Sequence, residues 1–183
     1  EFVLIIGPTG SGKSTLLYLI NGIIPHIFGG RLLGEVIVEN FSPKDKPIRE
    51  VSKFIGTVFQ NPDNQIFMLK VEDDVCFGCE NLLLPKEEIV KRRDSALKEM
   101  GLWEIRDRQV SKLSGGQKQR LAIAGVYAMG PNIFLFDEPT TDLDKKGREQ
   151  FFEILKKLKA EGKTIILVEH QYGEFLKLAD KLV

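Results

Sequence analysis

The sequence predicts an α/β fold in which helices cover a mainly parallel sheet and an α-helical subdomain is inserted into that core. Short apolar, β-branched runs alternate with helix-like stretches along the 183 residues. Several of these runs are almost entirely apolar, as strands buried on both faces of a parallel sheet are. The middle of the chain, from Asn61 to Leu113, has helical periodicity and many charges but no convincing strand. This pattern is typical of a doubly wound α/β domain with a helical insert.

The strand candidates are runs rich in apolar and β-branched residues: Phe2–Ile6, Glu35–Val38, Phe54–Phe59, Ile133–Phe136 and Thr164–Val168. A further strand is expected to begin at Lys181. Helices are predicted where apolar residues recur at helical spacing: Leu16–Ile20, Lys86–Met100, Leu121–Met129 and Gly147–Glu161. We expect residues 1–60 and 119–183 to form the α/β core and residues 61–118 to form the helical subdomain.

The composition excludes several classes of protein. The 26 basic and 26 acidic residues give a formal net charge of zero, which argues against nucleic acid or an anionic membrane surface as a partner. No apolar run approaches the roughly 20 residues that cross a bilayer, so no direct membrane insertion is expected. With 43% hydrophobic residues and two cysteines, the composition predicts a soluble, globular protein of a reducing compartment.

A phosphate-binding loop follows the first strand candidate. The stretch from Gly7 to Thr15 fits the pattern G-x-x-x-x-G-K-[ST] and stands between a buried strand and an apolar helix, which is the context that this P-loop motif requires. Its glycines let successive N–H groups point at phosphates, and the helix N-terminus adds a positive dipole. Lys13 is expected to bridge the β- and γ-phosphates, and Ser14 to bind Mg²⁺. The predicted ATP-binding residues are Gly7, Pro8, Thr9, Gly10, Ser11, Gly12, Lys13, Ser14 and Thr15.

Two acids end the apolar strand Ile133–Phe136. Asp137 and Glu138 are expected at the carboxyl end of a parallel strand, where open α/β sheets bind ligands. Successive side chains of an extended chain point in different directions, so the two acids can take different roles. We expect Asp137 to bind Mg²⁺ through water and Glu138 to polarise the attacking water.

A second glycine-rich helix start lies at Leu113–Arg120, which reads LSGGQKQR. Ser114 is a good N-cap, and the glycines after it predict a bare helix N-terminus with free N–H groups, which is a second anion site. A single chain has no evident use for two sites on one nucleotide. In a head-to-tail dimer, however, the second site of each subunit closes over the γ-phosphate of its partner.

These motifs and their order resemble the ATP-binding cassette (ABC) ATPases along most of the chain. Gln60 stands where the family has its Q-loop glutamine, Thr141–Asp144 where it has the D-loop, and His170 where it has the switch histidine. The resemblance implies an ATPase that uses ATP and Mg²⁺ and works as a dimer closing on two ATP molecules. The implied catalytic residues are Glu138 as general base, His170 on the γ-phosphate and the water, and Gln60 as the sensor. The implied Mg²⁺ residues are Ser14, Gln60 and Asp137. Across the dimer, the implied residues are Ser114, Gly115, Gly116, Gln117 and Asp144.

The chain departs from the family pattern in places. Thr141 replaces a common serine but keeps the hydroxyl, whereas Glu169 and Gln171 flank His170 where many members have Thr and Asp. Gln171 therefore puts in doubt any carboxylate contact that this Asp makes. The aromatic residue that stacks on adenine is expected upstream of the first strand, outside this sequence.

The short stretches Phe59–Phe67 and Glu72–Asn81, together with Asn21–His26, are similar to the ATPases of energy-coupling-factor importers, which take up vitamins or transition-metal ions. The resemblance implies a peripheral protein on the cytoplasmic face of the membrane, with a second ATPase subunit and an integral membrane transporter subunit as partners. We expect a coupling helix of that subunit to dock on an apolar patch of Phe67, Met68, Leu69 and Val71, or these residues belong to the subdomain core. The solute, homo- versus heterodimer pairing and the presence of a second cassette stay open.

Other functions are weighed against this one. The segment between Gln60 and Leu113 has no heptad pattern, which argues against the coiled-coil ATPases of DNA repair. A ribosome-associated cassette factor usually carries basic arms, which the zero net charge does not favour. This factor and another ABC importer class remain the alternatives. Cys76 and Cys79 lack the second cluster that a zinc site needs, so we expect buried free thiols, and His26 is interpreted as structural.

Overall fold

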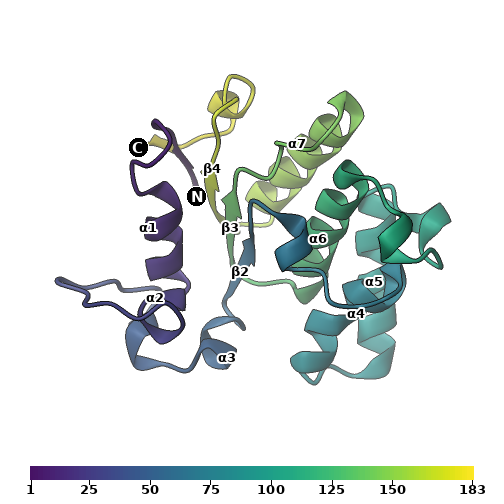
Figure 1. Cartoon of the computed structure of the whole chain (residues 1–183), viewed down its shortest axis with the longest axis horizontal. Helices are drawn as coiled ribbons and strands as arrows, with labels where there is room; N and C mark the ends of the chain where they lie inside the picture. Colours follow the sequence, from purple (N-terminus) through teal and green to yellow (C-terminus); the bar gives the residue numbers. More distant parts are fainter.

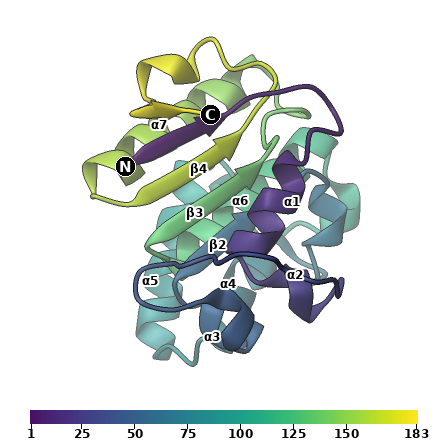
Figure 2. The same ribbon diagram turned by 90° about the vertical axis from the view of Figure 1, so that its left-hand side faces the viewer.

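The sheet has five parallel strands in the order β2-β3-β4-β1-β5, and the computed structural model describes all 183 residues. The strands are β1 Phe2–Ile5, β2 Ile55–Val58, β3 Ile133–Asp137, β4 Thr164–Val168 and β5 Lys181–Leu182. Figure 2 shows this order, with β1 between β4 and the C-terminal end of the chain. The predicted α/β fold with a mainly parallel sheet is thereby confirmed.

One predicted strand is wrong. Residues 35–38 alternate between exposed and less exposed side chains, as a half-buried strand does, but they form no part of the sheet. Val38 makes only an isolated antiparallel bridge with Phe41. Alternation gives a segment strand character, yet a strand also needs a neighbouring strand that accepts its hydrogen bonds, and no strand of the sheet pairs with this segment.

Seven α-helices accompany the sheet: α1 Lys13–Ile20, α2 Ile23–His26, α3 Ile48–Val51, α4 Val71–Asn81, α5 Lys86–Glu99, α6 Gly115–Met129 and α7 Lys145–Ala160. The predicted helices are all present, and three of them begin earlier than expected. For α7 the reason is the Asp144 carboxylate, which accepts the Gly147 N–H at 2.7 Å and so caps a helix that starts at Lys145. Gly162, in the left-handed conformation at φ 77°, follows its end.

The helices form two unequal layers on the sheet. α1 covers one face, whereas α6 and α7 cover the other, and α4 and α5 pack on the far side of α6 (Figure 1). The predicted boundary after residue 118 falls inside α6, which contacts α4, α5 and β2. The approach to β2 is close because a Cβ on Gly56 would lie 2.6 Å from Val126 of α6. One hydrophobic core therefore extends from the sheet into the helical region.

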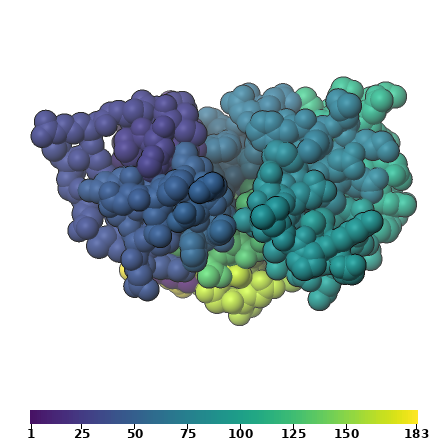
Figure 3. Space-filling view, turned by 90° about the horizontal axis from the view of Figure 1, so that it is seen from below, coloured from purple at the N-terminus to yellow at the C-terminus, as the bar shows by residue number.

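No helix of the structure combines the length and the apolar character needed to cross a bilayer. The molecule is divided by a depression between the segment that contains α1 to α3 and the helices α4 and α5 (Figure 3).

Candidate functional site

The carboxyl ends of the strands bring the candidate residues together. β1 leads into the loop 7–12, β3 ends in Asp137 and is followed by Glu138, and β4 is followed by Glu169 and His170. Because the paired strands are parallel, these ends meet at one edge of the sheet. This is the edge at which open α/β sheets bind ligands.

The loop before α1 has the backbone of a phosphate cradle. Gly10 and Gly12 are in the left-handed region, at φ 82° and 95°, and a Cβ at either position meets nothing within 4 Å. α1 has no side-chain cap. No group of the chain accepts a hydrogen bond from the N–H groups of Lys13, Ser14 and Thr15. These free donors, with the helix dipole behind them, fit a polyphosphate anion.

Lys13 is folded into this loop. Its side-chain Nζ donates to the carbonyl oxygens of Gly7 and Pro8, at 2.9 Å each, and only 8% of the residue is exposed. A buried ammonium needs such partners, because an unpaired buried charge is costly. The charge is thereby held beside the free N–H groups of the helix start.

Asp137 lies in an environment that suits a cation ligand. The residue is 2% exposed and its Oδ1 has no hydrogen-bond partner in the protein. Burial raises the pKa of Asp137, and the nearby Ser14 hydroxyl and Lys13 oppose the rise. A hydroxyl and a carboxylate side by side are oxygen ligands of the kind that Mg²⁺ takes, so these residues fit the ion.

Glu138 contacts both of the other residues that are predicted to be catalytic. Its Oε2 accepts a hydrogen bond from Gln60 Nε2 at 2.9 Å, and its Oε1 lies 2.9 Å from His170 Nε2. Glu138 is in the left-handed conformation at φ 48°, which is unusual for a residue with a side chain. The structure therefore places Gln60, Glu138 and His170 in one contiguous set, although they come from three separate strand ends.

A buried carboxylate that the sequence did not single out for a role supports the turn at His170. Glu169 is 3% exposed, and its Oε1 accepts the N–H groups of His170 and Gln171 at 2.9 and 3.3 Å. Its Oε2 accepts from the Thr140 hydroxyl at 2.7 Å. Glu169 thus connects the segment after Glu138 to the segment that carries His170. The sequence signal that could have identified Glu169 is its position as an acid directly after a buried strand.

Arg148 of α7 binds the same turn from its outer side. The guanidinium donates to the side-chain oxygen and the main-chain carbonyl of Gln171, and it forms an ion pair with Glu174 at 3.0 Å. The amide oxygen of Gln171 accepts this bond where a family Asp would supply a carboxylate. No local sequence pattern pointed to Arg148, because its partners lie more than 20 residues away.

The start of α6 has the Ser114 N-cap that the sequence predicts, and the first N–H groups of the helix are free, as expected. The Ser114 hydroxyl accepts the Gln117 N–H at 3.3 Å, and Gln117 Oε1 accepts the Ser114 N–H at 3.0 Å, which together form a capping box. The N–H groups of Gly115 and Gly116 have no acceptor in the chain. A Cβ at Gly116 would lie 2.8 Å from the Asp142 carbonyl, so this start packs directly on the D-loop of its own chain.

The remaining candidates lie away from this site. Cys79 is buried and its thiol donates to the Ala128 carbonyl at 3.3 Å, while Cys76 is partly buried. Burial raises the pKa of Cys76 to about 11, so both groups are thiols at neutral pH. The His26 ring Nε2 lies 3.0 Å from the Pro43 carbonyl, a contact that fixes α2 to the following loop.

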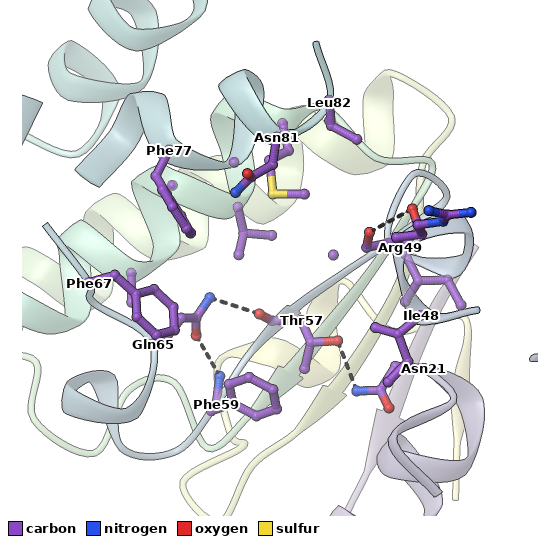
Figure 4. Close-up of a pocket in the computed structure, with 18 of the residues that line it drawn as sticks. Asn21, Ile48, Arg49, Thr57, Phe59, Gln65, Phe67, Phe77, Asn81 and Leu82 are labelled. Atoms are coloured by element: carbon purple, nitrogen blue, oxygen red, sulfur yellow. Dashed lines mark hydrogen bonds between the residues drawn. The ribbon is translucent and has the colours of Figure 1, made fainter. Parts of the chain in front are cut away.

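A groove of about 470 Å³ separates the sheet lobe from the α4 helix (Figure 4). Phe67 and Phe77 line it, and their rings lie 5.5 Å apart. Of the predicted apolar patch, Phe67 and Leu69 are exposed, whereas Val71 is completely buried and belongs to the core. The first turn of α4 begins at Val71, and packing of that turn against the core takes its side chain out of the patch.

Comparison with known proteins places these features in a family. The family model described as "ABC transporter" matches residues 1–141. An ABC transporter ATP-binding protein of Methanosarcina mazei is 46% identical over 100% of this chain, and one of Saccharolobus solfataricus is 42% identical. The chain spans 31% and 34% of these two proteins. It covers 65% of a Pyrococcus horikoshii relative, which is 46% identical.

Solved structures agree with the fold. The chain matches cbiO1 of Clostridium perfringens, described as part of the ABC transporter complex cbiONQ, with a TM-score of 0.83 and 38% identity, over 100% of this chain and 72% of that one. It also matches the ATP-binding cassette MJ0796, solved as a dimer in a post-hydrolysis state with ADP and Pi. That match has a TM-score of 0.79 and 36% identity, over 93% of this chain and 75% of the other.

Proposed function

Because this chain belongs to the ABC transporter family, we propose that it binds and hydrolyses ATP to power a membrane importer of the energy-coupling-factor type. The observation that carries the proposal is Glu138, held between Gln60 and His170 at the edge of the sheet that also bears the phosphate loop. The polyphosphate is bound by the free N–H groups at the start of α1 and by Lys13.

Glu138 acts as the general base for hydrolysis. It takes a proton from the water that attacks the γ-phosphorus, the bond from that phosphorus to the bridging oxygen breaks, and ADP and phosphate leave. Gln60 and His170 orient the carboxylate and the water on either side. Ser14, Asp137 and Gln60 would hold Mg²⁺, which supplies positive charge against the phosphate oxygens.

Two copies of the cassette, or this cassette and a second one, complete each site. The start of α6 has no hydrogen bond to the phosphate loop of its own chain, and its free N–H groups at Gly115 and Gly116 suit a phosphate of a partner. Ser114, Gln117 and Asp144 are proposed to act across the same dimer. The dimeric structure of MJ0796 supports this arrangement.

The membrane subunit is proposed to place a coupling helix in the groove between the sheet lobe and α4. The groove has a volume of about 470 Å³ and is lined by both apolar and polar side chains, which suits an amphipathic helix. The description of cbiO1 as part of a transporter complex supports a transport role. With that partner, the chain is a peripheral protein on the cytoplasmic face of the membrane that takes part in the uptake of a vitamin or a transition-metal ion.

Glu138→Gln tests the proposal. The amide keeps the shape of the side chain but cannot accept the proton, so ATP turnover should fall by about 10²- to 10⁴-fold while ATP binding remains. The variant should also accumulate an ATP-dependent dimer in size-exclusion chromatography. Glu161→Gln, an exposed change outside the site, is the matched control. Wild-type turnover in Glu138→Gln would remove Glu138 as the base.

A further inference from the structure

The edge of the sheet that faces the groove is closed by a side chain. β2 is the outermost strand, so one side of its backbone has no neighbouring strand. On that side the Gln65 amide donates from Nε2 to the Thr57 carbonyl at 2.9 Å, and its Oε1 accepts the Phe59 N–H at 3.1 Å (Figure 4). One planar amide thus makes the pair of hydrogen bonds that a neighbouring strand would make.

The segment that carries Gln65 is fixed at its other end by α4. The Asp74 carboxylate accepts the N–H groups of Phe67 and Met68 through Oδ1, at 2.8 and 2.9 Å. Asp74 is 8% exposed, so this anchor lies within the protein at the wall of the groove. Gln65 therefore stands between an anchored loop on one side and the end of β2 on the other.

Gln60 follows Phe59 directly and makes a hydrogen bond to Glu138. Its side chain is exposed and has no other hydrogen bond, so its direction depends on the backbone at the end of β2. The two bonds of Gln65 hold that backbone at Thr57 and Phe59, one residue before Gln60. A shift in this strand end would move the Gln60 amide relative to the Glu138 carboxylate.

We propose that Gln65 is a positioning residue that sets Gln60 against Glu138 for ATP hydrolysis, an inference that rests on the proposed function. It acts through the end of β2 and does not touch the reacting atoms. Few side chains can replace Gln65, because the side chain at this position must donate one hydrogen bond and accept another at the same time. Glutamate keeps the acceptor but loses the donor, and methionine has the length of glutamine but makes neither bond.

The test compares Gln65→Met and Gln65→Glu with the wild-type chain in steady-state ATP hydrolysis. Loss of both bonds in Gln65→Met should lower kcat about tenfold with KM unchanged. The kcat of Gln65→Glu should lie between that of Gln65→Met and that of the wild-type chain. Asn64→Ala is the matched control, since the neighbouring Asn64 side chain is exposed and makes no hydrogen bond. Equal kcat in all four proteins would overturn the proposal.

A double-mutant cycle separates positioning from a general loss of structure. If Gln65 acts through Gln60, then Gln65→Met should have no further effect on kcat in a Gln60→Ala background. Additive losses in the double variant would overturn the proposal, because they would show that Gln65 acts by another route. A wild-type chain without ATPase activity would instead refute the proposed function itself, and thermal melting of each variant checks that the fold is retained.

Discussion

Two helices of this chain begin with glycine-rich turns, and their N-termini are prepared differently. α1 starts after Gly12, with no side-chain cap and with the N–H groups of its first residues free. α6 starts after Ser114, whose hydroxyl and main chain are tied to Gln117 in a capping box. Lys13 lies beside the first start, whereas the ammonium of Lys118, in the first turn of α6, is paired with the Asp63 carboxylate.

The difference shows that similar glycine patterns can produce two kinds of helix start. The start of α1 carries uncompensated donors and a buried ammonium, so it is built to hold an anion from its own chain's site. The start of α6 is stable by itself, because its cap satisfies part of the backbone before any anion arrives. Each prediction below contrasts the two.

Lys13→Ala should have the largest effect, because it removes the charge at the uncapped start. Hydrogen bonds to charged groups contribute about 1.5–3 kcal/mol, so ATP affinity should fall about 100-fold. Titration with a fluorescent ATP analogue measures this, with Lys156→Ala as a control at an exposed lysine. Unchanged affinity in Lys13→Ala would show that the backbone donors alone hold the phosphates.

Ser114→Arg should leave ATP binding to the single chain intact and lower turnover by about 10-fold or more, because a large side chain at the α6 start blocks a partner's phosphate. Lys13→Ala, by contrast, should lower ATP binding itself, since the start of α1 is the one proposed to bind the chain's own nucleotide. Binding and turnover are measured on the same preparation. Full activity in this variant would contradict a site shared between two chains.

Dilution should expose the same dependence without a mutation. If the α6 start of a partner completes each site, the turnover per chain of a dilute sample should fall about tenfold for a tenfold dilution, by mass action. Phosphate release is followed over a range of protein concentrations. A constant turnover per chain would indicate that one chain contains a complete site.

The smallest expected effects are losses of stability, which should be similar in size for variants at the start of α1 and at the start of α6. Ser114→Ala removes a cap and should lower the free energy of unfolding by about 1 kcal/mol. Gly12→Ala places a Cβ at φ 95° and should cost about 1–2 kcal/mol from backbone strain. Urea unfolding without nucleotide measures both. A stability loss in neither variant would mean that the two starts do not differ in the way the cap and the φ angle indicate.

The local parts of the site were predictable from the sequence. The phosphate loop, the acids after β3 and His170 are each fixed by a few neighbouring residues, so their place at strand ends follows from the alternation of elements. The spacing of Ser114 and Gln117 is also a recognisable capping-box pattern. The predicted Ser114 cap and the free N–H groups of Gly115 and Gly116 are both present, because each depends only on residues of this first turn.

The contacts that connect distant segments could not be predicted. Arg148 meets Gln171 and Glu174 only after α7 and β4 have packed, and Thr140 meets Glu169 only through the sheet. Nothing in the local sequence of these residues records the partner. Residues 35–38 show the converse, since the local pattern of a strand is present and the partner is missing. Pairing over long sequence distances is a property of the fold.

The bonds that Gln65 makes with β2 also bear on how the protein behaves at high concentration. An outermost strand with free backbone groups can recruit a strand of another molecule and start aggregation. At the β2 edge, the Thr57 carbonyl and the Phe59 N–H are already occupied. This edge of the sheet therefore offers little template for another strand, and we expect Gln65→Met to precipitate more readily than Asn64→Ala during refolding.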